Sequence, residues 1–198
     1  MNKILVDSKE MFPLDEKVVL SDSKTYDLEV KDSKREVFLS VMDSTEVEIN
    51  ILLHQSSFHF HITLGNQSKL TLKILGVDSN IHLDTCLEQE DSDFECLYSL
   101  ISKTPSNNSI HVTHLAGHTT SNMKNHGYSL KGAELIFDVA STITKEATKC
   151  ISHQDNQMIQ SQNSTSKIYP NLYIDNYDVD ASHSAYVGEF REEELFIL

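Results

Sequence analysis

The 198-residue sequence has no tryptophan and is poor in glycine, proline and cysteine, with six, three and three residues of these types. So few glycines and prolines exclude a collagen-like chain and a flexible linker. The three cysteines, Cys86, Cys96 and Cys150, form no CxxC pair. The sequence therefore predicts no disulfide framework and suits a reducing compartment.

Long apolar runs and an excess of basic residues are also missing. No stretch approaches the roughly 20 apolar residues of a membrane-spanning helix, and Asp7 interrupts the short apolar start of the chain. We therefore expect a cytoplasmic protein. Acidic residues outnumber basic ones by 30 to 16, which gives a formal net charge of −14. Because this charge repels phosphate backbones and anionic lipid, neither nucleic acid nor a membrane is expected as a partner.

What the sequence has in abundance is alternation of apolar and polar residues. This period of two places successive side chains on opposite faces of a β-strand, while helical spacing is nearly absent. Turn-forming residues separate the alternating segments, as at Gly65, Gly117 and residues 105–108. The pattern predicts an all-β protein. The alternating segments are residues 47–51, 58–64, 70–74, 94–101, 110–115 and 135–139.

The architecture of these strands is open on periodicity alone. Short strands that start about every 11 to 15 residues fit a sandwich, a barrel or a parallel β-helix. No strict repeat is visible, and no Asn-Gly or Asp-Gly pair marks a tight hairpin. We expect one domain over residues 1–198, with residues 1–25 as a loosely attached lead-in and a helix starting within residues 192–198.

Histidines are the first candidates for chemistry. His59 and His61 lie two apart in one predicted strand, so they share a face and are roughly 6.6 Å apart along it. Two imidazoles at this spacing can share a metal ion, as in a cupin-like β-barrel, although the glutamate expected shortly after them is missing. The odd spacing of His111 and His114 places these two on opposite strand faces, so they are not expected to bind a metal together.

Motifs for catalysis are absent from the sequence. It contains no glycine-rich phosphate loop, no G-x-S-x-G motif and no H-E-x-x-H motif. Cys86 and Cys96 match no spacing of a cluster-binding site, and we expect both to be inert, as buried cysteines usually are. Cys150 and His153 are three residues apart and remain a candidate ligand pair. The sequence therefore offers no basis for an enzyme.

The last 31 residues, IYPNLYIDNYDVDASHSAYVGEFREEELFIL, resemble the closing segment of the SufB/SufD family of iron–sulfur cluster assembly proteins. The family pattern has a proline, a hydrophobic strand, an acidic turn with Asp-Val, a segment around a histidine, and an acidic Leu-Phe-Tyr-Leu end. The resemblance extends over about residues 105–198 and more loosely over the strands before them. The matching residues are Pro170, Leu172, Ile174, Asp178, Val179, His183, Ala185, Gly188, Leu195, Phe196 and Leu198.

This resemblance implies a right-handed parallel β-helix and a non-catalytic role. It implies pairing through the C-terminal end of the β-helix with a SufB-like subunit or with a second copy, and binding of a SufC-type ATPase. His183 corresponds to a functionally important histidine of SufD-like members. It would lie at the shared face as a ligand of iron or of a transient cluster, and no tightly bound cofactor is implied. The expected interface residues are Tyr177, Val179, His183, Tyr186 and Val187.

The residues that depart from the family pattern indicate which member of the family this chain resembles. SufB-like scaffolds carry a cysteine shortly before the proline, and Ser164 is the residue nearest to that position here, so the chain resembles SufD. Ser184, Tyr186 and Asp138 replace residues common in the family. The family's N-terminal helical region, and the small helical domain after the core that docks SufC, have no counterpart in these residues, so binding of SufC would depend on residues 192–198 or on a partner. The alternatives are a metal-binding β-barrel that uses His59 and His61, and a structural β-solenoid that has lost cluster assembly.

Overall fold

The computed structural model describes residues 16–130 and 132–190 of the chain, without the side chain of Phe190. These residues form fourteen strands and no helix. The strands are β1 (Lys17–Leu20), β2 (Lys24–Lys31), β3 (Lys34–Val41), β4 (Glu46–His54), β5 (Ser57–Leu64), β6 (Lys69–Val77), β7 (Asn80–Leu87), β8 (Asp93–Ser102), β9 (Ser106–His114), β10 (Thr120–Ser129), β11 (Glu134–Ile143), β12 (Cys150–Ser161), β13 (Thr165–Ile174) and β14 (Val179–Phe190).

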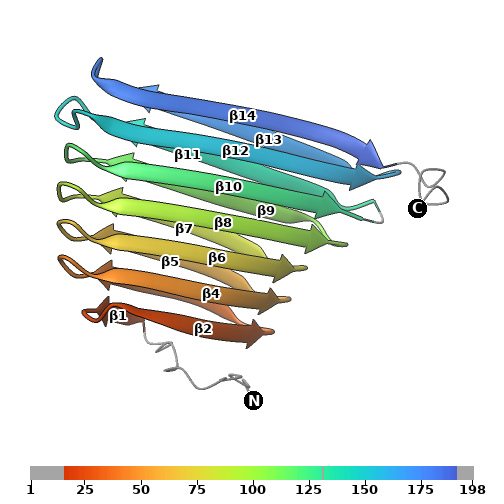
Figure 1. Cartoon of the computed structure of the whole chain (residues 1–198). Coiled ribbons are helices and arrows are strands. Elements are labelled where there is room, and N and C mark those ends of the chain that lie inside the picture. Colours follow the sequence, from red (N-terminus) through yellow and green to blue (C-terminus); the bar gives the residue numbers. More distant parts are fainter. Residues whose placement is uncertain (1–15, 131, 191–198) are drawn as a thin grey trace.

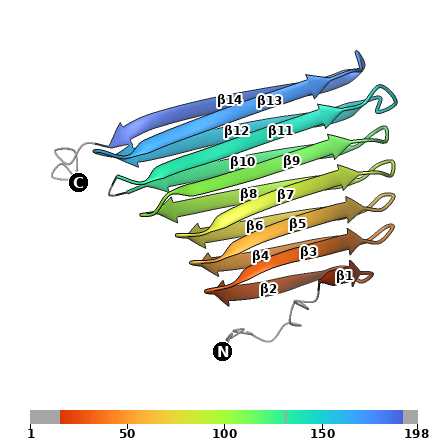
Figure 2. The ribbon, with the colours of Figure 1, turned by 180° about the vertical axis from the view of Figure 1, so that it is seen from behind.

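Consecutive strands alternate between two parallel sheets. The odd-numbered strands form one sheet in the order β1-β3-β5-β7-β9-β11-β13, and the even-numbered strands form the other, from β2 to β14. The chain therefore winds as a right-handed solenoid with two strands per turn (Figures 1 and 2). The all-β prediction and the β-helix that the resemblance implies are confirmed. Because every strand pairing is parallel, the sandwich and the barrel are excluded, and with them a cupin-like fold.

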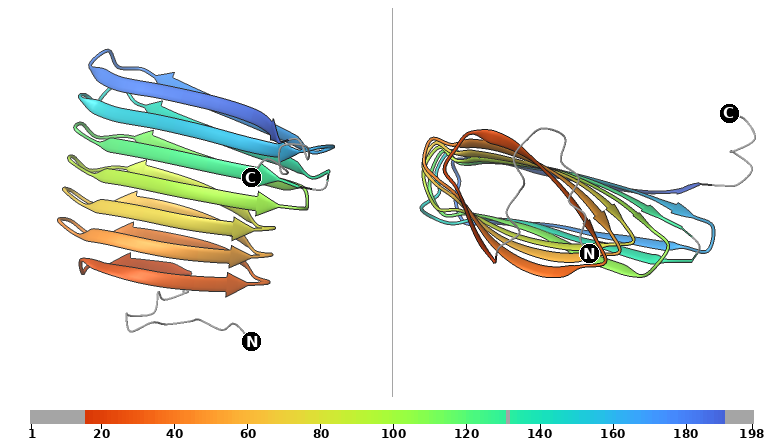
Figure 3. Two further views of the ribbon diagram at one scale, coloured as in Figure 1. Left: turned by 45° about the vertical axis from the view of Figure 1, so that its right-hand side comes forward. Right: turned by 90° about the horizontal axis from the view of Figure 1, so that it is seen from below.

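The hydrophobic core lies between the two sheets, which face each other along the whole solenoid (Figure 3). Alternation in each strand creates it: Phe58, Phe60 and Ile62 of β5 are almost fully buried, and the residues between them point outward. Adjacent turns stack these residues in register, as Phe60 with Leu83 of β7. Each turn thus covers the apolar core side chains of the turn before it.

The turns repeat with a regular spacing in the N-terminal half. Residues of neighbouring turns are 23 apart, as in the hydrogen bonds from the amide of Ser33 to Oγ of Ser56 and from the amide of Ser56 to Oγ of Ser79, both 3.2 Å. Gln55 and Asp78 hold left-handed backbone conformations at this corner, with φ of 47° and 48°. Towards the C-terminus the spacing grows to 31 residues. A repeat therefore exists, although different side chains fill its positions.

The interior becomes polar in the C-terminal half. Nδ2 of Asn125 donates a 2.8 Å hydrogen bond to Oδ1 of Asn156 one turn further on, and both residues are fully buried. The buried ring of His114 lies 2.7 Å from Oγ1 of Thr119 and 2.9 Å from Oγ of Ser121. Burial lowers the pKa of His114 to about 4. Stacked polar side chains thus replace apolar ones and bond to each other between turns, although the buried Oδ1 of Asn125 has no partner among the described residues.

Both ends of the chain lie partly outside the described residues. Within the expected lead-in, Lys17–Leu20 already form β1, which pairs with β3, and β2 begins at Lys24. The described part of that segment therefore belongs to the first turns of the solenoid, and residues 1–15 lie outside the described residues. The helix expected within residues 192–198 also falls outside them.

Candidate functional site

The last turn of the solenoid, β13 and β14, is covered on one side only. Each of these strands ends its sheet, since β13 pairs with β11 and β14 with β12, and no described strand follows. Terminal strands offer unpaired backbone groups to another chain. Apolar side chains accompany this free edge. The large exposed ones on or beside β13 and β14 are Tyr169, Tyr173, Ile174, Tyr177, Tyr186 and Val187.

His183 lies in the middle of β14. Its register partner on β12 is Gln154, whose side chain is buried, so the two side chains share the interior face of the sheet. His183 is nevertheless exposed, because no further turn covers β14 within the described residues. Beside it, Oε1 of Gln154 is buried without a hydrogen-bond partner in the described chain. His183 therefore presents a solvent-accessible imidazole at the uncovered end of the polar interior.

The other predicted interface residues fall into three positions. Val179 and Val187 are in register with the buried Cys150 and Met158, so they share the interior face with His183. Tyr186 points to the opposite face, where its ring lies so close to Gly188 that a Cβ there would be 2.8 Å from the tyrosine hydroxyl. Tyr177 lies in the turn before β14 and is fully exposed. The five residues thus surround the edge of β14 and do not form a single flat face.

The cysteines lie apart from each other, and Cys150 alone of the three borders this edge, in register with Val179 of β14. Cys96 is fully buried, and burial, with a smaller effect of Glu95, raises the pKa of its thiol to about 12. Burial likewise raises the pKa of the half-buried Cys86. Cys150 is buried in the core, with Sγ 3.2 Å from Oγ1 of Thr119. His153, three residues on, lies on the other face of β12, so the candidate pair of Cys150 and His153 is not brought together.

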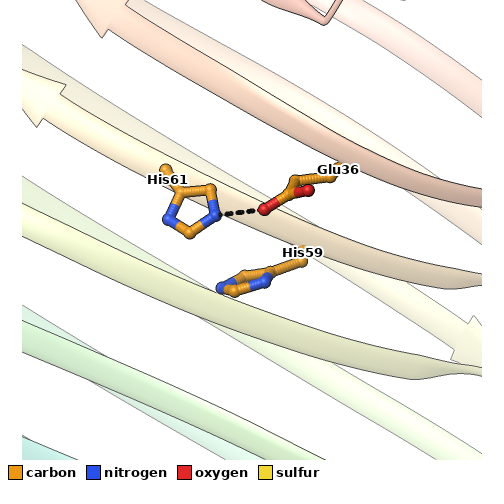
Figure 4. A group of neighbouring side chains, drawn as sticks. All are labelled: Glu36, His59 and His61. Atoms are coloured by element: carbon orange, nitrogen blue, oxygen red, sulfur yellow. Dashed lines mark hydrogen bonds and ion pairs between the residues drawn. The ribbon is translucent and has the colours of Figure 1, made fainter.

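A second group of polar side chains lies on the outer face of the odd-numbered sheet. His59 and His61 share this face of β5, as predicted, and their ring centroids are 4.0 Å apart. Glu36 of β3 joins them, with Oε1 2.9 Å from Nε2 of His61 (Figure 4). One ligand atom from each of the three residues lies within 4.8 Å of the other two. We call these three residues the histidine–glutamate cluster.

Further turns continue the cluster along the sheet. Oδ2 of Asp84 on β7 is 2.6 Å from Nε2 of His59 and 3.9 Å from Nδ1 of His61. Oδ1 of the same carboxylate is 3.7 Å from Nδ1 of His111, whose Nε2 is 3.3 Å from Oδ2 of Asp138. Imidazoles and carboxylates therefore alternate across four neighbouring turns. His111 and His114 lie on opposite faces of β9, as the odd spacing predicts.

The carboxylates of this surface lie too far from the histidines in the sequence to be recognised as part of one motif. Glu36 precedes His59 by 23 residues and Asp84 follows His61 by the same interval, which is one turn of the solenoid. A glutamate sought within a few residues of His61, as in a cupin motif, is therefore missing, while the neighbouring turns supply two carboxylates. The 23-residue repeat is the signal that identifies them.

Comparison with protein families gives one match. The family model described as SUF system FeS cluster assembly, SufBD core domain, matches residues 49–198. The chain belongs to the SufB/SufD family. The match begins well before the C-terminal segment and includes β5, so the histidine pair lies within the SufBD core. No curated protein matches the chain.

The residues of this SufBD core that depart from the family pattern form hydrogen bonds or an ion pair in the structure. Ser164, nearest to the cysteine position of SufB, lies in the turn before β13, where its Oγ accepts a 3.0 Å hydrogen bond from the amide of Gly132. Ser184 donates to Oδ1 of Asp155 at 2.8 Å, which lowers the pKa of that carboxyl. Asp138 faces His111. Over the described residues of this SufBD core, no helix has the length and hydrophobicity to cross a bilayer.

Proposed function

We propose that the chain is a non-catalytic, SufD-like subunit of an iron–sulfur cluster assembly scaffold, which pairs with a SufB-like subunit and associates with a SufC-type ATPase. Membership of the SufB/SufD family indicates a role in iron–sulfur cluster assembly. The observation that carries the finer proposal is the last turn of the solenoid, where the family match coincides with a free sheet edge rimmed by exposed apolar side chains.

Pairing at this edge has a clear physical basis. A strand added beside β14 would satisfy its outer backbone groups and extend the sheet, and a partner turn would cover the interior face of His183 and Val187. The interior that ends there is polar, since the exposed His183 is in register with the buried Gln154, so a partner face with polar groups fits it. A second solenoid with the same architecture meets both needs.

In the paired state His183 lies on the shared face. Its imidazole is a suitable ligand for iron, and a partner subunit would supply the remaining ligands of a transient cluster. Ser164 offers no thiolate, the thiol of Cys96 is buried and protonated, and Cys150, although it borders β14, is fully buried with its Sγ against Oγ1 of Thr119. We therefore assign the cluster-anchoring thiolates to the partner and a single histidine ligand to this chain.

Genetic replacement in the source organism tests this function. Deleting the gene should lower the iron–sulfur content of cellular protein, and the variant His183→Ala should reproduce the loss. The matched control is His126→Ala, which removes an exposed histidine from β10. Unchanged cluster content after deletion would contradict the assembly role and favour the structural solenoid. Normal cluster content with His183→Ala alone would remove His183 from the mechanism and leave the pairing in place.

A further inference from the structure

The histidine–glutamate cluster lies on β3 and β5, towards the opposite end of the solenoid from β14 (Figures 2 and 4). It is made of His59, His61 and Glu36 and does not touch the edge proposed for pairing. Both imidazoles and the carboxylate are between about one third and three fifths exposed. A small solute can therefore reach all three side chains from solvent.

Stability alone does not account for such a group. Exposed ion pairs contribute little, with a median of about 0–1 kcal/mol. Two imidazoles with centroids 4.0 Å apart would repel each other if both were protonated. Unprotonated ring nitrogens are the form of histidine that binds metals.

We propose that Glu36, His59 and His61 form a binding site for a divalent first-row transition metal ion. Two imidazoles and one carboxylate are the donor set of Zn²⁺ sites and of non-haem Fe²⁺ sites, and they disfavour Mg²⁺ and Ca²⁺, which prefer oxygen ligands. This inference does not depend on the proposed pairing function.

The geometry fits a metal with small side-chain adjustments. Donor atoms around a tetrahedral ion at about 2.1 Å lie about 3.4 Å apart. Nε2 of His61 and Oε1 of Glu36 are 2.9 Å apart, and the ligand atom of His59 lies within 4.8 Å of both. Rotation of these partly exposed side chains would bring the three donor atoms to the spacing that the ion needs. The ring of Phe38 stacks on His61 with centroids 4.5 Å apart and holds it in place. The backbone already fixes the three Cα positions in adjacent strands.

Asp84 completes the arrangement from the other side. Its Oδ2 lies 2.6 Å from Nε2 of His59, where it accepts a hydrogen bond from the ring N–H. A carboxylate bonded to one ring nitrogen orients the imidazole and makes the other nitrogen a stronger donor to a metal. The carboxylates of Glu36 and Asp84 also place two negative charges directly beside the imidazoles. Both effects favour a cation.

Titration of the untagged, metal-free chain with Co²⁺ under anaerobic conditions tests the site. Bound Co²⁺ is followed by its visible d–d absorption and counted by equilibrium dialysis, and Zn²⁺ and Fe²⁺ are then used as competitors. We expect one saturable equivalent per chain. The double variant His59→Ala/His61→Ala should lose it, and Asp84→Asn should weaken it by roughly 10- to 100-fold.

Two further variants keep the result decisive. Glu36→Gln retains the shape of the side chain and should also weaken binding, so a folding defect of the double variant does not decide the outcome. His54→Ala/His126→Ala removes two histidines outside the cluster and should leave the equivalent intact. Absence of saturable binding to the wild-type chain, or binding that survives both His59→Ala/His61→Ala and Glu36→Gln, would overturn the proposal. Loss in the His54→Ala/His126→Ala control would equally overturn it, because binding would then be distributed over surface histidines.

Discussion

Protonation of His114 should destabilise the solenoid as the pH falls. The ring is buried, its two nitrogens face hydroxyl oxygens of Thr119 and Ser121, and burial lowers its pKa to about 4. In the unfolded chain the pKa of histidine is about 6.5. Between these two values the unfolded state binds a proton that the folded state does not. The stability contributed by the neutral ring is therefore fully present above the unfolded pKa and is lost as pH falls towards about 4.

The magnitude follows from the two pKa values. A folded pKa of about 4 and an unfolded pKa of about 6.5 give a loss of about 2 kcal/mol between about pH 8 and about pH 5. The largest loss, reached below the folded pKa, is about 3 kcal/mol. Such losses are a sizeable part of the usual stability of a domain, about 5–15 kcal/mol.

The variant His114→Gln isolates this effect from all other titrating groups. The amide side chain can still bond the two hydroxyls but does not titrate. Urea titrations at both pH values give the free energy of unfolding of each protein. We expect the wild-type chain to be more stable at the higher pH, and its advantage over the variant to shrink by about 2 kcal/mol at the lower pH. An advantage that is the same at both pH values would refute the burial argument.

The remaining predictions concern packing and thiol reactivity. Gly65→Ala should lower the free energy of unfolding by about 1–3 kcal/mol, because a Cβ there would lie 2.7 Å from the backbone nitrogen of Asp43 in the preceding turn. Gly76→Ala should cost less, since the atom nearest to its Cβ would be the end of the Leu100 side chain, at 3.0 Å, and Ser79 and Tyr98 would lie at an ordinary contact distance of 3.7 Å. Equal losses in two urea titrations would contradict this reasoning. In the native chain Cys96 should react with a thiol reagent only on unfolding, because burial raises its pKa to about 12, and rapid labelling of Cys96 detected by mass spectrometry would argue against the buried position.

Much of the fold could be predicted from the sequence, because each strand carries its own signal. The alternation at Phe58, Phe60 and Ile62 reports a strand with one buried face, and the structure has those residues in the core of β5. Periodicity could not choose between a barrel and a solenoid, since both bury alternate residues. That choice depends on which strand lies beside which, and only the resemblance of the C-terminal segment to a β-helix family predicted it.

The residues of the candidate sites also differ in how far the sequence could predict them. His59 and His61 were identified because both lie in one strand, whereas Glu36 and Asp84 come from the turns before and after it. Side chains one turn apart are distant in sequence, and the 23-residue interval is hidden because many residue types fill equivalent positions. The exposure of His183 on the interior face could not be read from sequence either, since it follows from β14 being the last described strand of its sheet.

The most direct test of the pairing function is the mass of the complex in solution. The chain is co-expressed with the SufB-like subunit of its source organism and analysed by size-exclusion chromatography with light scattering. We predict a one-to-one complex that Val187→Lys, at the free edge of β14, abolishes. Val19→Lys, at an exposed apolar position on β1, should leave the complex intact. A chain that elutes alone beside the SufB-like subunit, or a complex unaffected by Val187→Lys, would contradict pairing through the last turn.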